Sequence, residues 1–572
     1  MNVLGINCAG HDSSVALIQD GRLVFAAEEE RFTRRKHDNR FPKESLRAAL
    51  RYANIEFAQL DAVAFGHEHA PAHGLQDLKA LITGKVAPSL MNLAAPFLVT
   101  AYQLYMGNGR RPMQDAFGSL SHLRVMDVNH HDAHAWSAYG LSGFEESLIV
   151  VVDGRGGTQS TSLYHARGDS IRRVKSYDYP NSLGLLYAAF TTQLGFEPFS
   201  DEWKVMGLAA YGTPTHDLHG AIRTSPDGYQ VNARLFAGLN VLSPGRSRLP
   251  RMRALYGPPG NADALTRADQ DLAASIQQVT EQAMADLVAE GVRLTGCRNL
   301  CLAGGVAMNS KANGKIAASG LVDEVFVQPA ATDDGTAIGA AIAAHAALGA
   351  GIPRYRMEEV YWGPEFSEGD AMDALHTFKL PSHVTPDLEA VVASELAQGK
   401  IIGWFQGRME FGPRALGNRS ILADPRRAEM KDLVNDSIKF RESWRPFAPS
   451  CLAEAAGDYF EGCRAAPYMI VTYEVKPEKR GVIPAVTHVD NSARVQTVTR
   501  SANPRYYRLI EAFGRQTGVP VIMNTSFNLK GEPIVCTPQD ALKTFYSSGL
   551  DFLVLGDRIV PKDPSWRLPD PD

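Results

Sequence analysis

The sequence of 572 residues has little of several features that mark large protein classes. Its six cysteines are scattered, and no two have the C-x-x-C spacing of a zinc or dithiol site, which favours a reduced protein of the cytoplasm. Positive charge is not in excess, because 58 Lys and Arg face 63 Asp and Glu. The net charge of -5 offers no general attraction to nucleic acid or to an anionic membrane, so any polyanion must bind at a local cluster.

Targeting and membrane-spanning segments are also lacking. The N-terminus reads MNVLGINCAGHDSS, without the basic and then apolar segments of a secretory signal. One stretch, residues 86–109, carries no charge. Four residues interrupt it that a lipid-facing helix would not accommodate without hydrogen-bond partners: Asn92, Pro96, Thr100 and Gln103. We therefore expect buried helices there rather than a membrane span.

A pattern of three short strands occurs twice in the first half of the chain. The first copy comprises residues 3–7, 13–19 and 22–28. The second comprises residues 147–157, 161–167 and 170–179. In each copy a Gly-Asp pair, Asp20-Gly21 or Gly168-Asp169, predicts a hairpin turn. Two such units can hold the phosphates of a nucleotide on facing backbone N–H groups, as in the actin-like ATPase fold.

Two further segments, residues 299–316 and 325–348, read as a strand, a loop and a helix. Glycines after the first of these strands permit close approach of the backbone to a flat ring or a ribose. An ordinary α/β turn is the alternative at each point, but four such turns in the order of one fold favour a nucleotide site. The candidate residues are Gly154, Gly304, Gly305, Asn309 and Asp334.

A metal site is predicted in the same half. His130 and His134 are four residues apart, so a helix would bring both imidazoles to one face. A polar helix face is the alternative explanation. Asp153 and Asp333 each lie at the mouth of a predicted strand and could add carboxylates, a mixed set that suits Fe(II), Mn(II) or Zn(II). Asp334 could be the ligand in place of Asp333.

The length suggests two to four domains, and the composition changes past residue 350, where Pro, Gly and charge mix as in a linker. We expect a first domain over residues 1–358, a linker over 359–367 and a second domain over 368–572. The second contains many arginines among Gly, Pro and aromatic residues. Guanidinium forks with amide and hydroxyl donors suit a small, multiply charged phosphate, although a solvated basic face is the alternative.

Seven strings, distributed from residue 11 to about residue 535, carry a resemblance to a known family. They are HDSSVAL, EEERFTRRKH, EWKVMGLAAYG, GRMEFGPRALGNRSI, RPFAPS, HVDNSARVQ and NTSFNLKGEPIV. Together they resemble the O-carbamoyltransferases of the NodU/CmcH type, a family that includes antibiotic-tailoring enzymes.

The resemblance implies an α/β protein with an N-terminal actin-like (ASKHA, duplicated ribonuclease-H-like) domain and a C-terminal YrdC-like domain. The second domain would convert carbamoyl phosphate and ATP to carbamoyl adenylate, and the first would transfer the carbamoyl group to an acceptor hydroxyl. The family's metal site matches the two histidines and two aspartates named above. The positions that match its carbamoyl-phosphate and ATP contacts are Arg414, Lys439, Arg445, Arg494, Asn524 and Ser526.

His11, beside Asp12, is the candidate general base for the acceptor hydroxyl, because imidazole titrates near neutrality. A histidine that caps the loop is the alternative. The expected cofactors are ATP with Mg and one Fe(II), Mn or Zn ion. The expected acceptor is a hydroxylated natural product or sugar, with its pocket shaped by residues 86–109 and 213–260.

We expect a monomer or homodimer that binds neither nucleic acid nor membrane. Two other functions share the first fold. One is a tRNA threonylcarbamoyl-transfer enzyme, which the acidic chain disfavours. The other is an actin-like ATPase or sugar kinase, which needs no arginine-rich second domain.

Overall fold

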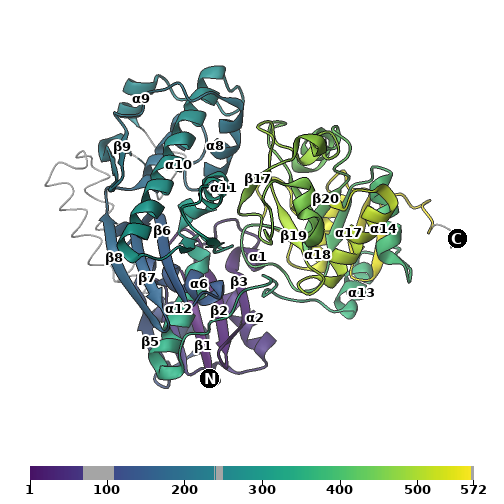
Figure 1. The fold of residues 1–572 in the computed structure, drawn as a ribbon. Helices are drawn as coiled ribbons and strands as arrows, with labels where there is room; N and C mark the ends of the chain where they lie inside the picture. Colours follow the sequence, from purple (N-terminus) through teal and green to yellow (C-terminus); the bar gives the residue numbers. More distant parts are fainter. Residues whose placement is uncertain (9, 68–108, 237–238, 240–248, 569–572) are drawn as a thin grey trace. The chain divides into compact units, whose positions relative to one another are not determined.

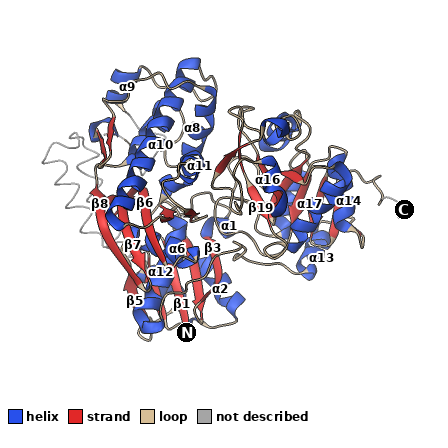
Figure 2. Ribbon diagram, in the orientation of Figure 1, coloured by secondary structure: helices blue, strands red, loops and turns tan. Residues whose placement is uncertain are grey.

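The computed structural model describes residues 1–8, 10–67, 109–236, 239 and 249–568. The uncharged stretch expected to form buried helices lies, up to residue 108, outside these residues. Within the part of the chain that is described, no helix has the length and apolar character needed to cross a bilayer. Helices and strands mix throughout the chain (Figure 2), as the predicted α/β class requires.

The chain divides into two compact units. The first comprises Met1–Glu29 and His37–Met357, and the second comprises Glu30–Lys36 and Glu358–Asp572. The chain therefore leaves the first unit for seven residues near its start and then returns. The sequence did not indicate this excursion, and the domain boundaries expected above stay a prediction.

The first unit contains two five-stranded sheets of one design (Figure 1). The first sheet has the order β3 (Arg22–Glu28), β2 (Ser14–Gln19), β1 (Asn2–Asn7), β4 (Ala62–Phe65), β5 (Arg124–Asp127). The second has the order β8 (Ser170–Asp178), β7 (Gln159–Arg167), β6 (Glu146–Gly156), β11 (Asn299–Ala303), β12 (Glu324–Val327). In both sheets the first three strands are antiparallel and the last three are parallel. This repeated topology confirms the duplicated ribonuclease-H-like, actin-like fold.

Two helices pack against each other between these sheets. α12 (Thr336–His345) lies on β1, β2 and β4, and α6 (His130–Ser142) lies on β6 and β11. Their backbones approach closely at Gly339, where a Cβ atom would lie 1.7 Å from the carbonyl oxygen of Ala133. Gly339 therefore fixes the position of the helix that begins at His130.

We expect Gly339→Ala to lower the free energy of unfolding by about 1–3 kcal/mol, because the added methyl group must push the two helices apart. Chemical denaturation measures the loss. Gly220→Ala is the control, since a Cβ atom there meets nothing within 4 Å, and its effect should stay within about 0.5 kcal/mol. Equal stability of the two variants would contradict the close packing of α6 and α12.

The second unit is built on one mixed sheet of eight strands. Their order is β13 (His383–Val384), β22 (Arg558–Pro561), β21 (Phe552–Leu555), β14 (Ile402–Phe405), β15 (Arg419–Ala423), β20 (Val521–Ser526), β16 (Ala448–Leu452), β19 (Gln496–Val498). Alternate side chains of these strands enter two different cores. α14 (Leu388–Ala397) and α17 (Pro504–Thr517) complete one core, and α13 (Glu368–Thr377) and α18 (Pro538–Tyr546) complete the other. Helices therefore cover both faces of this α/β unit.

Candidate functional site

The two histidines of the predicted metal site lie in the first two turns of α6. Asn129 caps this helix, because its side-chain oxygen accepts a hydrogen bond of 3.1 Å from the backbone N–H of Asp132. His130 and His134 are one turn apart, and their Nε2 atoms lie 3.1 Å from each other. The helix thus presents two imidazole nitrogens to one point, as the spacing predicts.

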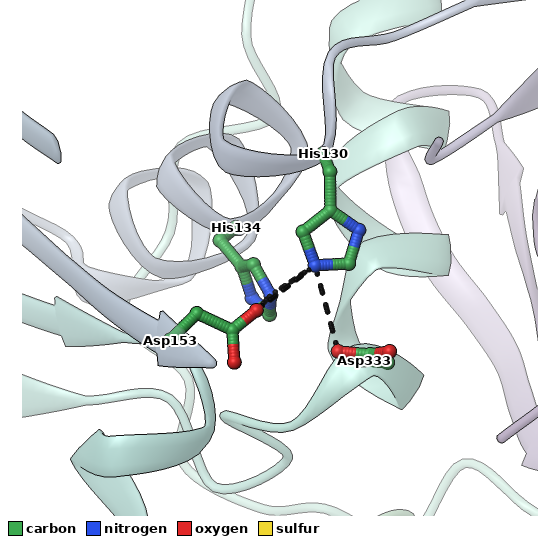
Figure 3. A group of neighbouring side chains, drawn as sticks. All are labelled: His130, His134, Asp153 and Asp333. Atoms are coloured by element: carbon green, nitrogen blue, oxygen red, sulfur yellow. Dashed lines mark hydrogen bonds and ion pairs between the residues drawn. The ribbon is translucent and has the colours of Figure 1, made fainter. Parts of the chain in front are cut away.

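Two carboxylates complete the group (Figure 3). Asp153 projects from β6, and its Oδ2 lies 3.1 Å from Nε2 of His130 and 3.7 Å from Nε2 of His134. Asp333 lies in the turn before α12, with its Oδ1 3.5 Å from Nε2 of His130. Four potential ligand atoms, one from each residue, lie within 4.8 Å of one another.

The electrostatics of this group suit a cation. Burial would lower the pKa of His130, but the charges and hydrogen bonds of Asp333 and Asp153 outweigh burial and raise that pKa to about 10. Burial would raise the pKa of Asp153, yet contact with both imidazoles holds it well below its usual value. Nδ1 of His134 is buried without a hydrogen-bond partner. Two nitrogens and two carboxylates fit a divalent transition metal.

The alternative ligand, Asp334, is not part of this group of four. Its Oδ2 accepts a hydrogen bond of 3.3 Å from Oγ1 of Thr332, and its backbone carbonyl accepts one of 2.8 Å from Ser14. These bonds hold it beside β2 rather than among the histidines. The geometry therefore favours Asp333 as the ligand.

Three glycines of the predicted nucleotide site lie around Asp153. The backbone N–H groups of Gly154 and Gly305 both donate to Oδ1 of Asp153, at 2.8 and 3.2 Å. Gly304 has a φ of 87°, and a Cβ atom there would lie 2.4 Å from the carbonyl oxygen of Val152. This turn therefore requires glycine at position 304.

Asn309 lies close by, but its side chain has local partners. It caps α11 (Ser310–Ala318) by accepting 3.1 Å from the backbone N–H of Ala312, and it exchanges two hydrogen bonds with Gln277. The nucleotide-binding role of these residues stays a prediction.

The predicted general base, His11, lies in a three-residue cluster. Nδ1 of His11 is 2.8 Å from Oδ2 of Asp12, and Nδ1 of His37 is 2.9 Å from Oδ1 of the same carboxylate. The cluster adjoins the metal group, because a Cβ atom on Gly10 would lie 3.3 Å from Oδ2 of Asp333. Sequence reasoning missed His37, whose only signal was its place at the end of the string EEERFTRRKH.

Carboxylates set the charge of this cluster. Burial would lower the pKa of His11, but Asp12, with smaller contributions from Asp333 and Glu202, raises it to about 9. Hydrogen bonds from both histidines lower the pKa of Asp12 although burial opposes them. Glu202 begins α8 (Glu202–Leu208), and burial raises its pKa to about 7. Sequence reasoning also missed Glu202, which lies in the string EWKVMGLAAYG.

The second unit gathers a cluster of basic side chains, of which Lys439 is 5% exposed and the others are partly buried. Burial and the neighbouring charges lower the pKa of each of three of them, Lys439, Arg441 and Arg494, well below the usual range. Burial and the charge of Arg445 lower the pKa of Arg414 to about 10. We call these five residues the basic cluster. Arg441 was not among the predicted contacts, although the string that contains it was singled out.

Carboxylate, amide, hydroxyl and carbonyl oxygens contact three of these side chains. Arg445 pairs with Glu442 at 3.4 Å, and Nε of Arg441 donates to Oδ1 of Asn435 at 2.6 Å. Nζ of Lys439 donates to the backbone carbonyl and hydroxyl of Ser526. It also donates to Asn528, at 3.1 Å to the carbonyl and 3.0 Å to Oδ1.

Asn524 contacts the backbone of the loop that carries Arg414. It is 1% exposed, and its Nδ2 donates to the backbone carbonyl of Ala415 at 3.3 Å. On the same loop, Oε1 of Glu410 accepts from three backbone N–H groups, those of Leu416, Asn418 and Arg419. Buried side chains therefore fix the backbone around Arg414.

Comparison with known proteins identifies the family of this chain. The family model for the carbamoyltransferase N-terminus matches residues 2–342, and the model for the carbamoyltransferase C-terminus matches residues 393–562. Nodulation protein NolNO of Sinorhizobium fredii is 39% identical over 96% of this chain and 79% of that protein. Nodulation protein NolO of Bradyrhizobium diazoefficiens is 43% identical over 77% of this chain and 79% of that protein.

Nodulation protein U of Rhizobium tropici is 32% identical over 93% of this chain and 91% of that protein. Among solved structures, HypF of T. kodakarensis overlays on 61% of this chain and 48% of that chain, with 14% identity and a TM-score of 0.32. The fold assignment rests on strand order and not on this overlay. The matches define an enzyme that transfers carbamoyl groups. The chain belongs to the carbamoyltransferase family and is of the NodU type.

Proposed function

We propose that this enzyme is an ATP-dependent O-carbamoyltransferase that works in two steps. The second unit would combine carbamoyl phosphate, one water molecule and ATP into carbamoyl adenylate, with release of phosphate and pyrophosphate. The first unit would transfer the carbamoyl group to a hydroxyl of a small molecule, with release of AMP. The observation that carries this proposal is the partly buried basic cluster of the second unit, which consists of Arg414, Lys439, Arg441, Arg445 and Arg494.

Buried like charges repel one another and are costly to desolvate without partners. The cations of the cluster lie close enough to lower one another's pKa values, so a multiply charged anion would stabilise it strongly. Carbamoyl phosphate and the triphosphate of ATP are such anions, and planar guanidinium groups bind their oxygens in pairs. Asn524 and Ser526 would complete this site, the first through the backbone of the loop that carries Arg414.

In the first unit, the acceptor hydroxyl would give its proton to His11. Asp12 engages Nδ1 of that ring, which leaves Nε2 as the atom that receives the proton. Asp12 would then stabilise the resulting imidazolium. The glycines Gly154, Gly304 and Gly305, with Asn309 and Asp334, would hold the nucleotide beside this pair.

His130, His134, Asp153 and Asp333 would hold the metal, for which Fe(II) is our first choice and Mn(II) or Zn(II) the alternatives. When bound, such an ion supplies stabilisation of negative charge on a phosphate group, as the departure of AMP requires. Mg would accompany ATP. We place the enzyme in the cytoplasm, since all six cysteines are free thiols.

The function is tested by two questions asked of the purified enzyme. The first is whether ATP turnover depends on carbamoyl phosphate, which separates this function from an actin-like ATPase or sugar kinase. The second is which member of a panel of hydroxylated sugars, aminoglycosides and macrolides gains the mass of one carbamoyl group. ATP turnover without carbamoyl phosphate would contradict the proposal.

For the metal site, we expect His134→Ala to weaken metal binding by about 10–100-fold, because a chelating pair loses one member. Elemental analysis and competition with a chelator measure the bound ion, and transfer should fall while the secondary structure is unchanged. His131→Asn is the matched control: Nδ1 of His131 bonds Oγ of Ser162 at 3.0 Å, outside the group of four. Equal metal content in the two variants would contradict the site.

A further inference from the structure

Seven residues of the N-terminal half are built into the second unit. Glu30–Lys36, which we call the strap, groups with Glu358–Asp572, whereas the residues on either side of it belong to the first unit. The strap contains the short helix α1 (Glu29–Thr33) except for its first residue. Nothing in its sequence marks it as part of a C-terminal structure.

The strap is held by its arginines and one aromatic ring. Arg31 is 4% exposed, and its Nη2 donates to the backbone carbonyl of Gly412 at 3.0 Å. Arg34 donates through Nη1 to the carbonyl of Ile534 at 2.6 Å and through Nη2 to that of Pro533 at 2.8 Å. Nε of Arg34 also lies 3.4 Å from Oδ1 of Asp540.

The ring of Phe32 packs against a small core of the second unit. This core consists of Met409, Ile534 and Cys536. Apolar burial thus holds the middle of the strap at the same two loops that the arginines reach. The strap is therefore an integral part of this unit.

These contacts fall on the two loops that carry the proposed anion site. Gly412 lies two residues before Arg414 of the basic cluster. Pro533 and Ile534 lie on the loop after β20, whose beginning contacts Lys439 through Ser526 and Asn528.

That second loop folds back on itself. The backbone N–H of Val535 donates to the carbonyl of Phe527 at 2.9 Å, and Nδ2 of Asn528 donates to the carbonyl of Glu532 at 2.7 Å. Fixing the carbonyls of Pro533 and Ile534 therefore also fixes the part of the loop that contacts Lys439.

Both flanks of the strap are anchored in the first unit. The carboxylate of Glu29 accepts hydrogen bonds from the backbone N–H groups of Glu44 and Ser45, at 3.0 and 2.8 Å. His37, at the other flank, contacts Asp12, which also holds His11. The chain therefore enters and leaves the strap at residues that are each fixed within the first unit.

We infer that Arg31 and Arg34 of the strap are positioning residues for the carbamoyl-phosphate site of the second unit. The N-terminal half of the chain thus supplies part of the adenylate-forming site, through hydrogen bonds to main-chain carbonyls. This inference rests on the proposed function of that site. It means that residues 358–572 alone lack two of the groups that order the site.

Arg34→Ala in the full-length enzyme tests the inference, because Arg34 is the less buried of the two arginines. In carbamoyl-phosphate-dependent exchange of pyrophosphate into ATP, we expect the KM for carbamoyl phosphate to rise about tenfold or more, the range for hydrogen bonds of a charged group, with kcat within about twofold. Arg34→Lys should recover part of the loss, since a point charge satisfies fewer of the acceptors.

Arg35→Ala is the matched control. It removes the same charge from the adjacent position, whose side chain is exposed and has no ion pair or hydrogen bond among the described residues, and its KM should be that of the unaltered enzyme. If Arg34→Ala does not fold, Arg34→Gln takes its place with the same expected rise in KM.

The outcomes separate the inference from the function on which it rests. An unaltered enzyme without carbamoyl-phosphate-dependent exchange would overturn the proposed function. Exchange in the unaltered enzyme with an unchanged KM in the Arg34 variants would overturn the inference alone. A loss of kcat and of active fraction at constant KM would show that the strap serves stability only, and would also overturn the inference.

Discussion

His11→Asn is expected to slow carbamoyl transfer by about 10²–10⁴, the usual range for loss of a general base. The same variant should form carbamoyl adenylate at the normal rate, because His11 belongs to the first unit and the basic cluster to the second. Mass analysis of the carbamoylated acceptor measures transfer, and exchange of pyrophosphate into ATP measures adenylate formation. A parallel fall of both activities would assign His11 a structural or nucleotide-binding role.

The pH dependence gives a second measure of the same residue. His11 must be neutral to accept a proton, and Asp12 raises its pKa to about 9. The kcat/KM of transfer should therefore rise with pH until about pH 9. In Asp12→Asn the pH at which kcat/KM rises should move down toward the ordinary histidine pKa of about 6.5. The exchange reaction serves as the control, since its kcat/KM should not show this rise. If the pH of the rise in transfer is unchanged in Asp12→Asn, the assignment of His11 is contradicted.

Arg494→Met should reduce the kcat/KM of the exchange reaction by about 10²-fold, since hydrogen bonds to a charged ligand contribute about 1.5–3 kcal/mol. Transfer should fall with it, because no adenylate would be supplied. Stability should respond in the opposite direction. Burial and the charges of Arg414, Arg441 and Arg445 lower the pKa of Arg494, so removal of its charge relieves repulsion, and the Tm should be unchanged or higher.

Two further variants sharpen the test of Arg494. Arg494→Lys should restore part of the activity, since a point charge cannot reproduce a bidentate fork. Arg500→Ala removes an exposed arginine that pairs with Glu511 at 3.0 Å, and both activities should be unaffected. A large drop in Tm together with lost activity in Arg494→Met would indicate that Arg494 supports the fold and not the ligand.

The metal group shows how far local sequence reasoning extends. A spacing of four residues places His130 and His134 together on any helix, so the pair was predictable from the sequence. Asp153 and Asp333 were predictable as residues after strands of a repeated unit. Their approach to the histidines depends on the packing of α6 against α12 and β6, which no local pattern encodes.

The remaining site residues show the limit of that reasoning. His37 lies 25 residues after Asp12 and was missed, because only the folded chain brings its Nδ1 to the Asp12 carboxylate. Arg441 and Asn528 are polar residues among many in the second half, and no local pattern ranks them above their neighbours. Both residues become part of the site only because the fold places them beside the other groups of the basic cluster and its loops.

The sequence by itself determined the repeated strand units, their hairpins, the helical histidine pair and the arginine-rich second half. These are local features, set by the alternation of apolar residues, by turn-forming Gly-Asp pairs and by helical periodicity. Only the tertiary structure decided that the Asp12 carboxylate joins His11 to His37, that five cations lie close enough for their charges to interact, and that Glu30–Lys36 belongs to the second unit. Those features arise because long-range burial brings distant charges together, where desolvation and mutual repulsion then set their pKa values.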